Sequence, residues 1–473
     1  MTTNKEKRFG QVFTPPYLVE DILDFAGYGG AVLLQRHAVD NSCGDGAFLV
    51  EMARRYCAAF FSAHGEGEKE TLARELGQFI HGMEKDAASH TACLARMRQL
   101  ERDVQLPPVH WDIRCADALH MRDFDGHMDF VIGNPPYVRV HNLEGDFARV
   151  KAYHFCSGGM TDLYLLFYEL GLRMLAPGGR LCYIAPSSWI NSVAGKHMRA
   201  HLQESGCLRA IADLRHFQPF NATTYTAITL LENTGGAHRF DYYSYAGERA
   251  LCFVETLPYD EAFFDGALFL GDRNTLRELR AIKTAPHAPR VRVKNGFATL
   301  ADGVFIADVF PFDDFIIPVI KASTGAQRKA LYPYDRNGKP LPRETVFSVA
   351  GVAAYLNARK DALLKGRDER HCPDWHLYGR SQALADVWRH KYAIGALVRD
   401  AASIKLHPAP PGTGVYSGLY ILTDAPEEQL RAALQCGRFI SYVAALRKYK
   451  SGGYYTFNAR ELEQYLNHAL GAS

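Results

Sequence analysis

Apolar runs and amphipathic stretches alternate along the first half of the chain. The run Phe130-Val131-Ile132, closed by Gly133, predicts a buried strand, and residues 161–170 carry apolar side chains at helical spacing. Further strands are predicted to end at Asp40, Glu84, Asp117 and Pro186. Strands that alternate with helices are typical of an α/β domain with a mostly parallel sheet.

Beyond about residue 240 this alternation fades, and short β-like segments, tyrosines and turn residues take over. The pattern predicts two domains, residues 1–240 and 241–473, of which the second is of the α+β type. A chain of 473 residues also exceeds one ordinary hydrophobic core.

The composition narrows the class of protein. Apolar residues make up 47% and charged residues 22%, which is typical of a soluble globular protein. The chain has no run of 18 apolar residues, so we expect no membrane span, and its first residues lack the apolar segment of a signal peptide. Ten scattered cysteines without a C-x-x-C pair argue against a zinc ribbon or a disulfide framework and favour a cytoplasmic protein.

The net charge of +2 hides an asymmetry between the two parts of the chain. Residues 291–473 hold 24 Lys and Arg against 17 Asp and Glu, a balance of +7, and the rest of the chain has a balance of −5. This modest excess places the expected contacts with a polyanion, such as nucleic acid, toward the C-terminus.

The turn after Ile132 has the clearest chemistry. Pro135 and Pro136 stiffen it, because each proline fixes its own φ and Pro136 keeps Pro135 out of the helical region. From this turn project the carboxamide of Asn134 and the ring of Tyr137. The Asn134 oxygen and the Pro135 carbonyl can each accept one N–H of the exocyclic amine of a planar base, which Tyr137 can stack upon. Such acceptors would assist attack of the amine on a methyl donor without a general base; the alternative is a simple proline-stiffened turn.

A loop of small residues, 41–46, separates the strand that ends at Asp40 from a predicted helix. In a doubly wound sheet a nucleotide-like ligand approaches the backbone at this first turn. Gly44 and Gly46 permit that approach, and Asp40 or Asp45 can meet the cationic end of an amino acid moiety.

Acidic residues also end two further strands. Glu84 is placed to accept hydrogen bonds from both hydroxyls of a ribose, with Asp86 as the second choice; the alternative is a solvated acid at a helix start. Asp117 could accept from the amine of a cofactor adenine.

Two aromatic or proline-rich segments flank this region. Thr14 is a good N-cap and Pro15 a good first helical residue before the amphipathic residues 18–23. Phe220 lies in a polar, proline-broken loop, where it serves either as the second face of an aromatic sandwich on an extruded base or as a loop anchor.

The C-terminal part holds two segments with possible DNA-facing chemistry, residues 375–382 and 447–455. Arg and Gln make bidentate contacts to base edges, whereas Lys more often holds phosphates. The weak candidates for contact with DNA are Arg380, Gln382, Lys448 and Lys450.

Taken in order, these residues resemble the γ-class DNA adenine-N6 methyltransferases of type II restriction–modification systems. The residues that carry the resemblance are Phe13-Thr14-Pro15-Pro16, which is similar to the N-terminal cofactor motif, residues 40–46, the acids Glu84 and Asp117, and Asn134-Pro135-Pro136-Tyr137, a full match to the catalytic motif. Residues 295–300 and 378–382 are loosely similar to the family's recognition domain. Asn41 departs from the family's usual proline, and we expect it to loosen the loop without removing a contact group.

The resemblance implies a Rossmann-like, seven-stranded, mostly parallel methyltransferase sheet, followed by a DNA target-recognition domain. It implies S-adenosyl-L-methionine as donor, a flipped adenine in double-stranded DNA as target, no metal, and a separately encoded cognate restriction endonuclease as functional partner in the cytoplasm, at the nucleoid. The implied cofactor contacts are Phe13, Thr14, Pro15, Asp40, Ser42, Cys43, Gly44, Asp45, Gly46, Glu84, Asp86, Asp117 and Ala118. The implied catalytic residues are Asn134, Pro135, Pro136, Tyr137 and Phe220.

Other classes share parts of this pattern. Methyltransferases that act on protein glutamine or on RNA bases also carry an Asn-Pro-Pro-Tyr turn, but resemble this chain only in the catalytic core. A fused restriction endonuclease is a further alternative; because the core starts within ten residues of Met1, we expect cleavage to need a partner protein. A non-catalytic DNA-binding subunit is disfavoured by the intact turn at 134–137.

Overall fold

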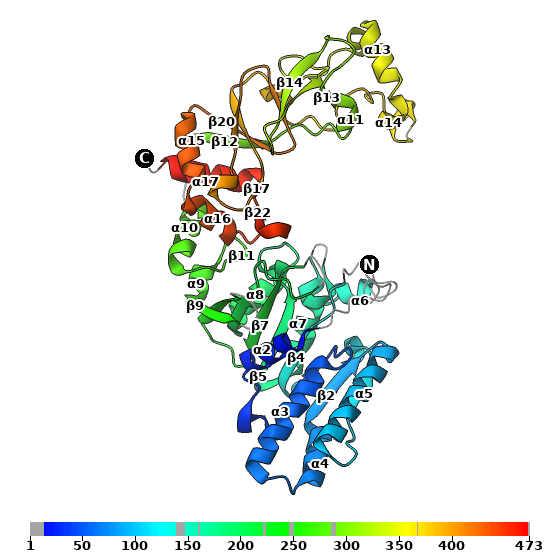
Figure 1. Ribbon diagram of the computed structural model, residues 1–473, viewed down its shortest axis with the longest axis vertical. Helices are drawn as coiled ribbons and strands as arrows, with labels where there is room; N and C mark the ends of the chain where they lie inside the picture. Colours follow the sequence, from blue (N-terminus) through cyan, green and yellow to red (C-terminus); the bar gives the residue numbers. More distant parts are fainter. Residues whose placement is uncertain are drawn as a thin grey trace. The chain divides into compact units, whose positions relative to one another are not determined.

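The structure is a computed structural model that describes residues 14–138, 147–158, 161–220, 224–245, 250–284, 290–366 and 368–471. The chain divides into two compact units, Met1–Arg277 and Glu278–Ser473 (Figure 1). The boundary expected between residues 240 and 241 falls inside a strand of the first unit, so it is corrected to the later position.

Unit 1 is built on one nine-stranded sheet with the strand order β3-β2-β1-β4-β5-β7-β6-β8-β9. Its strands are β1 Ala38–Asp40, β2 Ile80–Glu84, β3 Asp112–Cys115, β4 Met128–Gly133, β5 Leu175–Pro186, β6 Leu208–Asp213, β7 Thr226–Glu232, β8 Arg239–Tyr245 and β9 Leu251–Pro258. The five strands from β3 to β5 run parallel, and β7 runs antiparallel between β5 and β6. This confirms the α/β class and the mostly parallel sheet.

The expected number of seven strands is wrong, because β8 and β9 extend the sheet. β8 pairs in parallel with β6, and β9 returns antiparallel to β8. The residues that the structure describes between these two strands form no helix, so the strand–helix alternation that marked the domain in the sequence stops before the sheet does.

Helices surround the sheet of unit 1. They are α2 Pro16–Phe25, α3 Ala47–His64, α4 Lys69–Phe79, α5 Ala87–Val104, α6 Phe147–Lys151, α7 Leu163–Met174, α8 Lys196–Ser205, α9 Tyr259–Ala262 and α10 Arg273–Thr284, which crosses into unit 2. The apolar face of α3, including Leu49 and Met52, is buried in a core that it shares with α2, α5 and the strands β1, β2 and β4. Among the described residues no helix has the length and apolarity needed to cross a membrane.

The start of α2 differs from the expectation. Pro16 is the first helical residue and Pro15 is the N-cap, with φ −58° and ψ 146°. A proline disfavours the helical region for the residue before it, so Pro15 stays extended. Thr14 therefore lies outside the helix, and its hydroxyl is available for another contact, described below.

Unit 2 combines small sheets with helices. Its sheets are β12-β20-β16-β18, β13-β15-β14-β19 and β17-β22-β21. The strands are β12 Val291–Asn295, β13 Ile306–Ala307, β14 Ile316–Lys321, β15 Gln327–Leu331, β16 Lys391–Ile394, β17 Leu397–Val398, β18 Leu406–Ala409, β19 Gly414–Tyr416, β20 Leu419–Thr423, β21 Tyr449–Lys450 and β22 Tyr454–Thr456. The helices are α11 Asp302–Phe305, α12 Arg343–Phe347, α13 Ala350–Asn357, α14 Lys360–Leu364, α15 Glu427–Leu434, α16 Gly437–Ala445 and α17 Ala459–Gly471.

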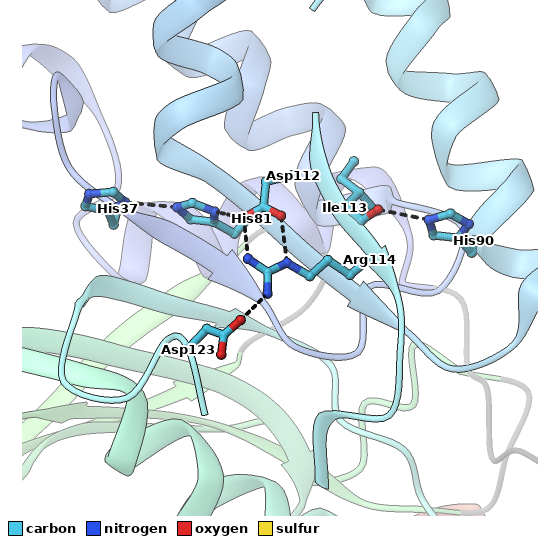
Figure 2. Close-up of polar contacts among 7 residues, drawn as sticks. All are labelled: His37, His81, His90, Asp112, Ile113, Arg114 and Asp123. Atoms are coloured by element: carbon cyan, nitrogen blue, oxygen red, sulfur yellow. Dashed lines mark hydrogen bonds and ion pairs between the residues drawn. The ribbon is translucent and has the colours of Figure 1, made fainter. Parts of the chain in front are cut away.

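A polar network ties the amino ends of β1, β2 and β3 together (Figure 2). His37, which precedes β1, shares a hydrogen bond of 2.9 Å with His81 of β2, and His81 Nδ1 lies 2.7 Å from Asp112 at the start of β3. Arg114 completes the chain with contacts of 2.7 Å to Asp112 and to Asp123. Asp112 is therefore held between a guanidinium and an imidazole, which lower the pKa of its carboxyl against the effect of burial.

Candidate active site

The carboxyl ends of β1, β2 and β4 form one edge of the sheet. β1 lies between β2 and β4 and runs parallel to both, so the turns that follow Asp40, Glu84 and Gly133 meet at this edge. In open α/β sheets ligands bind beyond the carboxyl ends of the strands, where the connections that follow two adjacent strands run to opposite faces of the sheet.

The glycine-rich turn after β1 is fixed by the two acids that end β1 and β2. Asp40 Oδ1 accepts the backbone N–H of Ser42 at 3.0 Å, and Glu84 Oε2 accepts that of Gly44 at 2.9 Å. Gly44 has φ +55° with open space where a Cβ would stand. Gly46 has φ +87°, and its Cβ would stand 2.6 Å from Cys93 Sγ of α5. Both glycines are therefore required by the backbone conformation, and Gly46 also by the packing of the turn on α5.

Asp40 is the most perturbed acid of this edge. It is 1% exposed, and burial raises the pKa of its carboxyl to about 8. The strand β4 passes so close that a Cβ on Gly133 would lie 2.5 Å from Asp40 Oδ1. Burial also raises the pKa of Glu84. Two desolvated carboxyls beside an open glycine turn suit a ligand that brings positive charge and hydrogen-bond donors.

The other acids named from the sequence have partners of their own. Asp86 is the N-cap of α5 and accepts from Ser89 N at 3.0 Å and Ser89 Oγ at 2.9 Å. Asp45 pairs with Arg96 at 2.9 Å. Asp117 accepts from the backbone of Leu119 and pairs with Lys85 at 2.7 Å, after β3 has already ended at Cys115. Between the two choices for the ribose, the structure therefore places Glu84 at the glycine turn and Asp86 in a helix cap.

The remaining candidates for cofactor contact lie around this turn. Cys43 is buried, and its hydrogen bond to Cys93 together with burial holds the pKa of its thiol well above the usual value. Ala118 is buried directly after Asp117. Phe13 lies outside the described residues.

Asn134 joins three segments that are far apart in the sequence. Its Nδ2 donates to Thr14 Oγ1 at 3.1 Å, and its backbone carbonyl accepts from Ser42 Oγ at 3.5 Å. The Thr14 hydroxyl, which the sequence suggested as a helix cap, instead orients the Asn134 carboxamide. Sequence reasoning missed this contact, because nothing in residues 14–16 indicates a partner 120 positions away.

Tyr137 and Phe220 lie side by side. Their ring centroids are 6.2 Å apart, but the rings meet edge to face at 77°. Two rings that sandwich a base lie parallel and about 7 Å apart, which is two van der Waals contacts. The two rings do not form a sandwich in this structure: Phe220 is buried in the core, and the Tyr137 hydroxyl donates to the carbonyl of Ile184 at 3.2 Å.

Asn41 does not loosen the glycine turn, contrary to expectation. It is 2% exposed, its Oδ1 accepts from the Tyr183 hydroxyl at 2.9 Å, and its Nδ2 lies 3.8 Å from Met174 Sδ. These contacts tie the start of the turn to β5 and to the end of α7.

In unit 2, two of the four candidates for DNA contact have internal partners. Gln382 Nε2 donates to the carbonyl of Gly296 at 2.6 Å, and Lys448 pairs with Glu461 at 2.6 Å. Arg380 and Lys450 are exposed.

Comparison with known proteins shows which protein family this chain is similar to. Residues 50–220 match the Eco57I restriction-modification methylase family. The chain is 36% identical over 234 residues to the type II methyltransferase M.XhoI of Xanthomonas vasicola, a match that covers 47% of this chain and 42% of the relative. It is 28% identical over 401 residues to M.PaeR7I of Pseudomonas aeruginosa, covering 77% of this chain and 68% of the relative. The match thus spans less than half of the first relative and about two thirds of the second.

A solved structure shares the fold over most of the chain. The type IIL restriction-modification enzyme MmeI, determined in complex with DNA, aligns with a TM-score of 0.61 at 13% identity and covers 94% of this chain and 63% of that one. The sequence matches confirm the resemblance to type II restriction–modification methyltransferases, and the structural match shows a shared fold.

Proposed function

We propose, from the restriction–modification methylase segment at residues 50–220, that this chain is a site-specific DNA methyltransferase acting on the N6 amino group of adenine in double-stranded DNA. The observation that carries the proposal is the position of Asn134. It leaves β4 beside the glycine turn of β1 and is linked to that turn through Ser42. An amine-binding carboxamide and a nucleotide-binding turn therefore share one edge of the sheet.

The residues at this edge fit S-adenosyl-L-methionine, which supplies an electrophilic methyl group when bound. Asp40 would meet its ammonium group, because a positive charge offsets the desolvation that raises the pKa of this carboxyl. Glu84 would accept from the ribose hydroxyls, since each carboxylate oxygen has lone pairs beyond the one used for a backbone N–H. Asp117 would accept from the adenine amine of the cofactor.

Asn134 and Pro135 would hold the target amine. The side-chain oxygen of Asn134 and the carbonyl of Pro135 accept its two N–H groups, which withdraws the lone pair from the ring and stabilises positive charge as the N–C bond forms. Thr14 keeps the carboxamide in one orientation before the substrate arrives, so that less ordering is needed during the reaction. Direct transfer would form the N–C bond as the S–C bond of the methyl donor breaks and its electron pair stays on sulfur, and the methylated amine would then lose one proton to solvent.

Tyr137 would stack on the flipped adenine. Its hydroxyl is anchored on β5 through Ile184, so the ring has a defined plane. Phe220 would complete a sandwich only after rotating from its present edge-to-face position. The DNA would belong to a type II system in which methylation protects against a separately encoded endonuclease.

The test is methyl transfer from labelled S-adenosylmethionine to unmethylated genomic DNA, bulk RNA and protein in parallel. We expect label in DNA, recovered as N6-methyladenine at one short motif when the product is digested and sequenced. Label in RNA or protein with none in DNA would overturn the proposal in favour of an RNA or protein methyltransferase.

A further inference from the structure

Three loops of unit 2 meet around an exposed tryptophan. Trp388 is 38% exposed and lies in segment 384–390, directly before β16. The turn at 334–340, closed by a bridge between Tyr334 and Pro340, packs on this segment so tightly that a Cβ on Gly338 would stand 2.6 Å from Ala385 N. Gly412 of the third loop donates its N–H to the carbonyl of Val387 at 3.0 Å.

A buried lysine, Lys391, fixes the backbone of segment 384–390. Lys391 is 2% exposed, and its ammonium donates to the backbone carbonyls of Asp386, Val387 and Arg389 at 2.8, 3.1 and 3.0 Å. Burial lowers the pKa of this ammonium to about 8. Burying a charged group is unfavourable unless its hydrogen bonds are satisfied, and here all three go to the loop that carries Trp388.

Asp386, which belongs to the same segment, fixes it through two side-chain contacts. It is 5% exposed and accepts from Lys294 at 2.6 Å and from the Tyr420 hydroxyl at 2.8 Å. A surface tryptophan that is merely covered by an arginine would not need a loop fixed by the buried contacts of Lys391 and Asp386. Trp388 is therefore presented to solvent by a loop of fixed conformation.

The surface around Trp388 is positively charged. The Arg336 guanidinium carbon stands 5.1 Å from the Trp388 ring centroid, and the side chain of Arg389 is 61% exposed. Lys294, Arg336, Lys339 and Arg389 are all exposed. The acids nearby are Asp386, which is buried, and Asp335, whose Oδ1 accepts the backbone N–H groups of residues 337 and 339. We call Arg336, Lys339, Trp388 and Arg389 the Trp388 surface.

The contact of Arg336 with Trp388 is within the range of a cation–π interaction, which restrains the guanidinium. Its N–H groups can match two acceptors at once, such as O6 and N7 of guanine or two phosphate oxygens. The indole adds an apolar face for a base or sugar, and the surrounding cations favour a polyanion.

We propose that the Trp388 surface contacts double-stranded DNA, with Arg336 as a bidentate donor to the acceptor edge of a base and Lys339 and Arg389 toward the phosphates. The proposal rests on the proposed function, because it names where unit 2 meets the DNA substrate. It differs from the sequence-based candidates, none of which lies on this surface.

The experiment compares the full-length chain with Arg336→Ala and Trp388→Ala, and with Arg359→Ala as a matched control. The Arg359 guanidinium also lies over an aromatic ring, at 3.7 Å from the centroid of Tyr355, but Arg359 is the N-cap of α14. Binding of two labelled duplexes of equal length, one with the motif mapped by sequencing and one without, is measured by fluorescence anisotropy over a range of salt concentrations. Melting temperatures of the variants report whether they fold.

Arg336→Ala is expected to weaken binding of the motif duplex by about 10- to 100-fold, the range of one bidentate base contact. Trp388→Ala is expected to weaken it by about 5-fold or more, from lost stacking and lost orientation of Arg336. A loss confined to the motif duplex assigns Arg336 to a base edge. An equal loss on both duplexes, with a salt slope lower by about one, assigns it to a phosphate; either result places the surface on DNA.

The proposal is overturned if both variants fold and bind both duplexes as tightly as wild type and Arg359→Ala. Kinetics separate it from the proposed function: Arg336→Ala should raise KM for DNA and leave kcat at saturating DNA and the affinity for S-adenosylmethionine unchanged. A wild-type protein that binds DNA through this surface but transfers no methyl group would overturn the proposed function alone. A wild-type protein that binds no DNA would overturn both.

Discussion

We call the amino ends of the parallel strands in unit 1 the amino edge of the sheet and their carboxyl ends the carboxyl edge. The acidic residues at these two edges lie in opposite environments. At the amino edge, Asp112 is satisfied by Arg114 and His81, and the pKa of its carboxyl is lowered (Figure 2). At the carboxyl edge, Asp40 is more deeply buried, accepts the backbone N–H of Ser42, and has a raised pKa. The same sheet thus carries one acid, at the start of β3, that stabilises the fold and one acid, at the end of β1, that is held in an unfavourable environment, which is typical of a binding site.

The largest effect is expected at the carboxyl edge, from Asn134→Ala. Loss of the amine acceptor should lower the rate of methyl transfer by about a thousandfold, the upper range for one transition-state hydrogen-bond group. The affinity for S-adenosylmethionine should stay near wild type, because Asn134 is not among the expected cofactor contacts, and the melting temperature should fall only slightly, because one hydrogen bond to Thr14 is lost. Single-turnover assays and calorimetric titration measure the two quantities, and lost cofactor affinity would show that the residue is assigned to the wrong role.

Exchanging the acids of the two edges for amides tests the comparison directly. Asp112→Asn should lower the free energy of unfolding by about 1–3 kcal/mol, because Arg114 and His81 lose a charged partner in a half-buried place. Asp40→Asn should leave stability unchanged or higher at neutral pH, since an amide needs no buried charge, while it weakens cofactor binding by about tenfold or more. Urea unfolding of both variants gives the comparison. If Asp40→Asn were the more destabilised variant, the assignment of the two edges would be reversed.

Thr14 should have a smaller effect, confined to catalysis. Thr14→Val removes the hydroxyl that accepts from Asn134 and should lower kcat by about 5- to 10-fold, the equivalent of roughly one hydrogen bond. Thr14→Ser keeps the hydroxyl and should restore most of the rate. Equal losses in both variants would indicate that packing of the methyl group matters, and not the hydrogen bond.

The smallest expected effect is a difference in pH dependence between the edges. The folded pKa of Asp40, about 8, lies above its ordinary value of 3.8, so its contribution to stability is complete at low pH and is lost as the pH rises toward 8. Burial lowers the pKa values of His37 and His81 below 6.5, so their contribution is complete above pH 6.5 and is lost as the pH falls below it.

Between pH 6.5 and 8 only Asp40 among these groups should therefore change stability. Unfolding free energies measured across this window should fall with rising pH in wild type and become flatter in Asp40→Asn. His81→Gln should alter the slope only below pH 6.5. A change in the upper window from His81→Gln would contradict the separation of the two edges.

Much of the site could be predicted because it consists of local signals. The glycine turn, the acids that end β1 and β2, and the turn at 134–137 each follow a short apolar strand, and parallel strands bring their carboxyl ends to one edge. The sequence ranked Glu84 before Asp86 for the ribose, but it did not show that Asp86 caps α5, because whether an acid caps a helix or faces a turn depends on where the following helix begins. The extent of the sheet was also missed, since β8 pairs with β6 and β9 pairs with β8, and the residues that the structure describes between β8 and β9 form no helix.

The sequence by itself determined the α/β class of the first unit, the resemblance to type II restriction–modification methyltransferases and the order of the motifs that carry it, because strand–helix alternation and turn chemistry depend on neighbouring residues. Only the tertiary structure decided the partner of Thr14, the edge-to-face position of Phe220 against Tyr137, and the loop that Lys391 supports. The contacts of Thr14 and Phe220 join residues far apart in the chain, whereas those of Lys391 are local but depend on its burial. Burial, which also sets the pKa of Asp40, exists only once the strands and helices have packed.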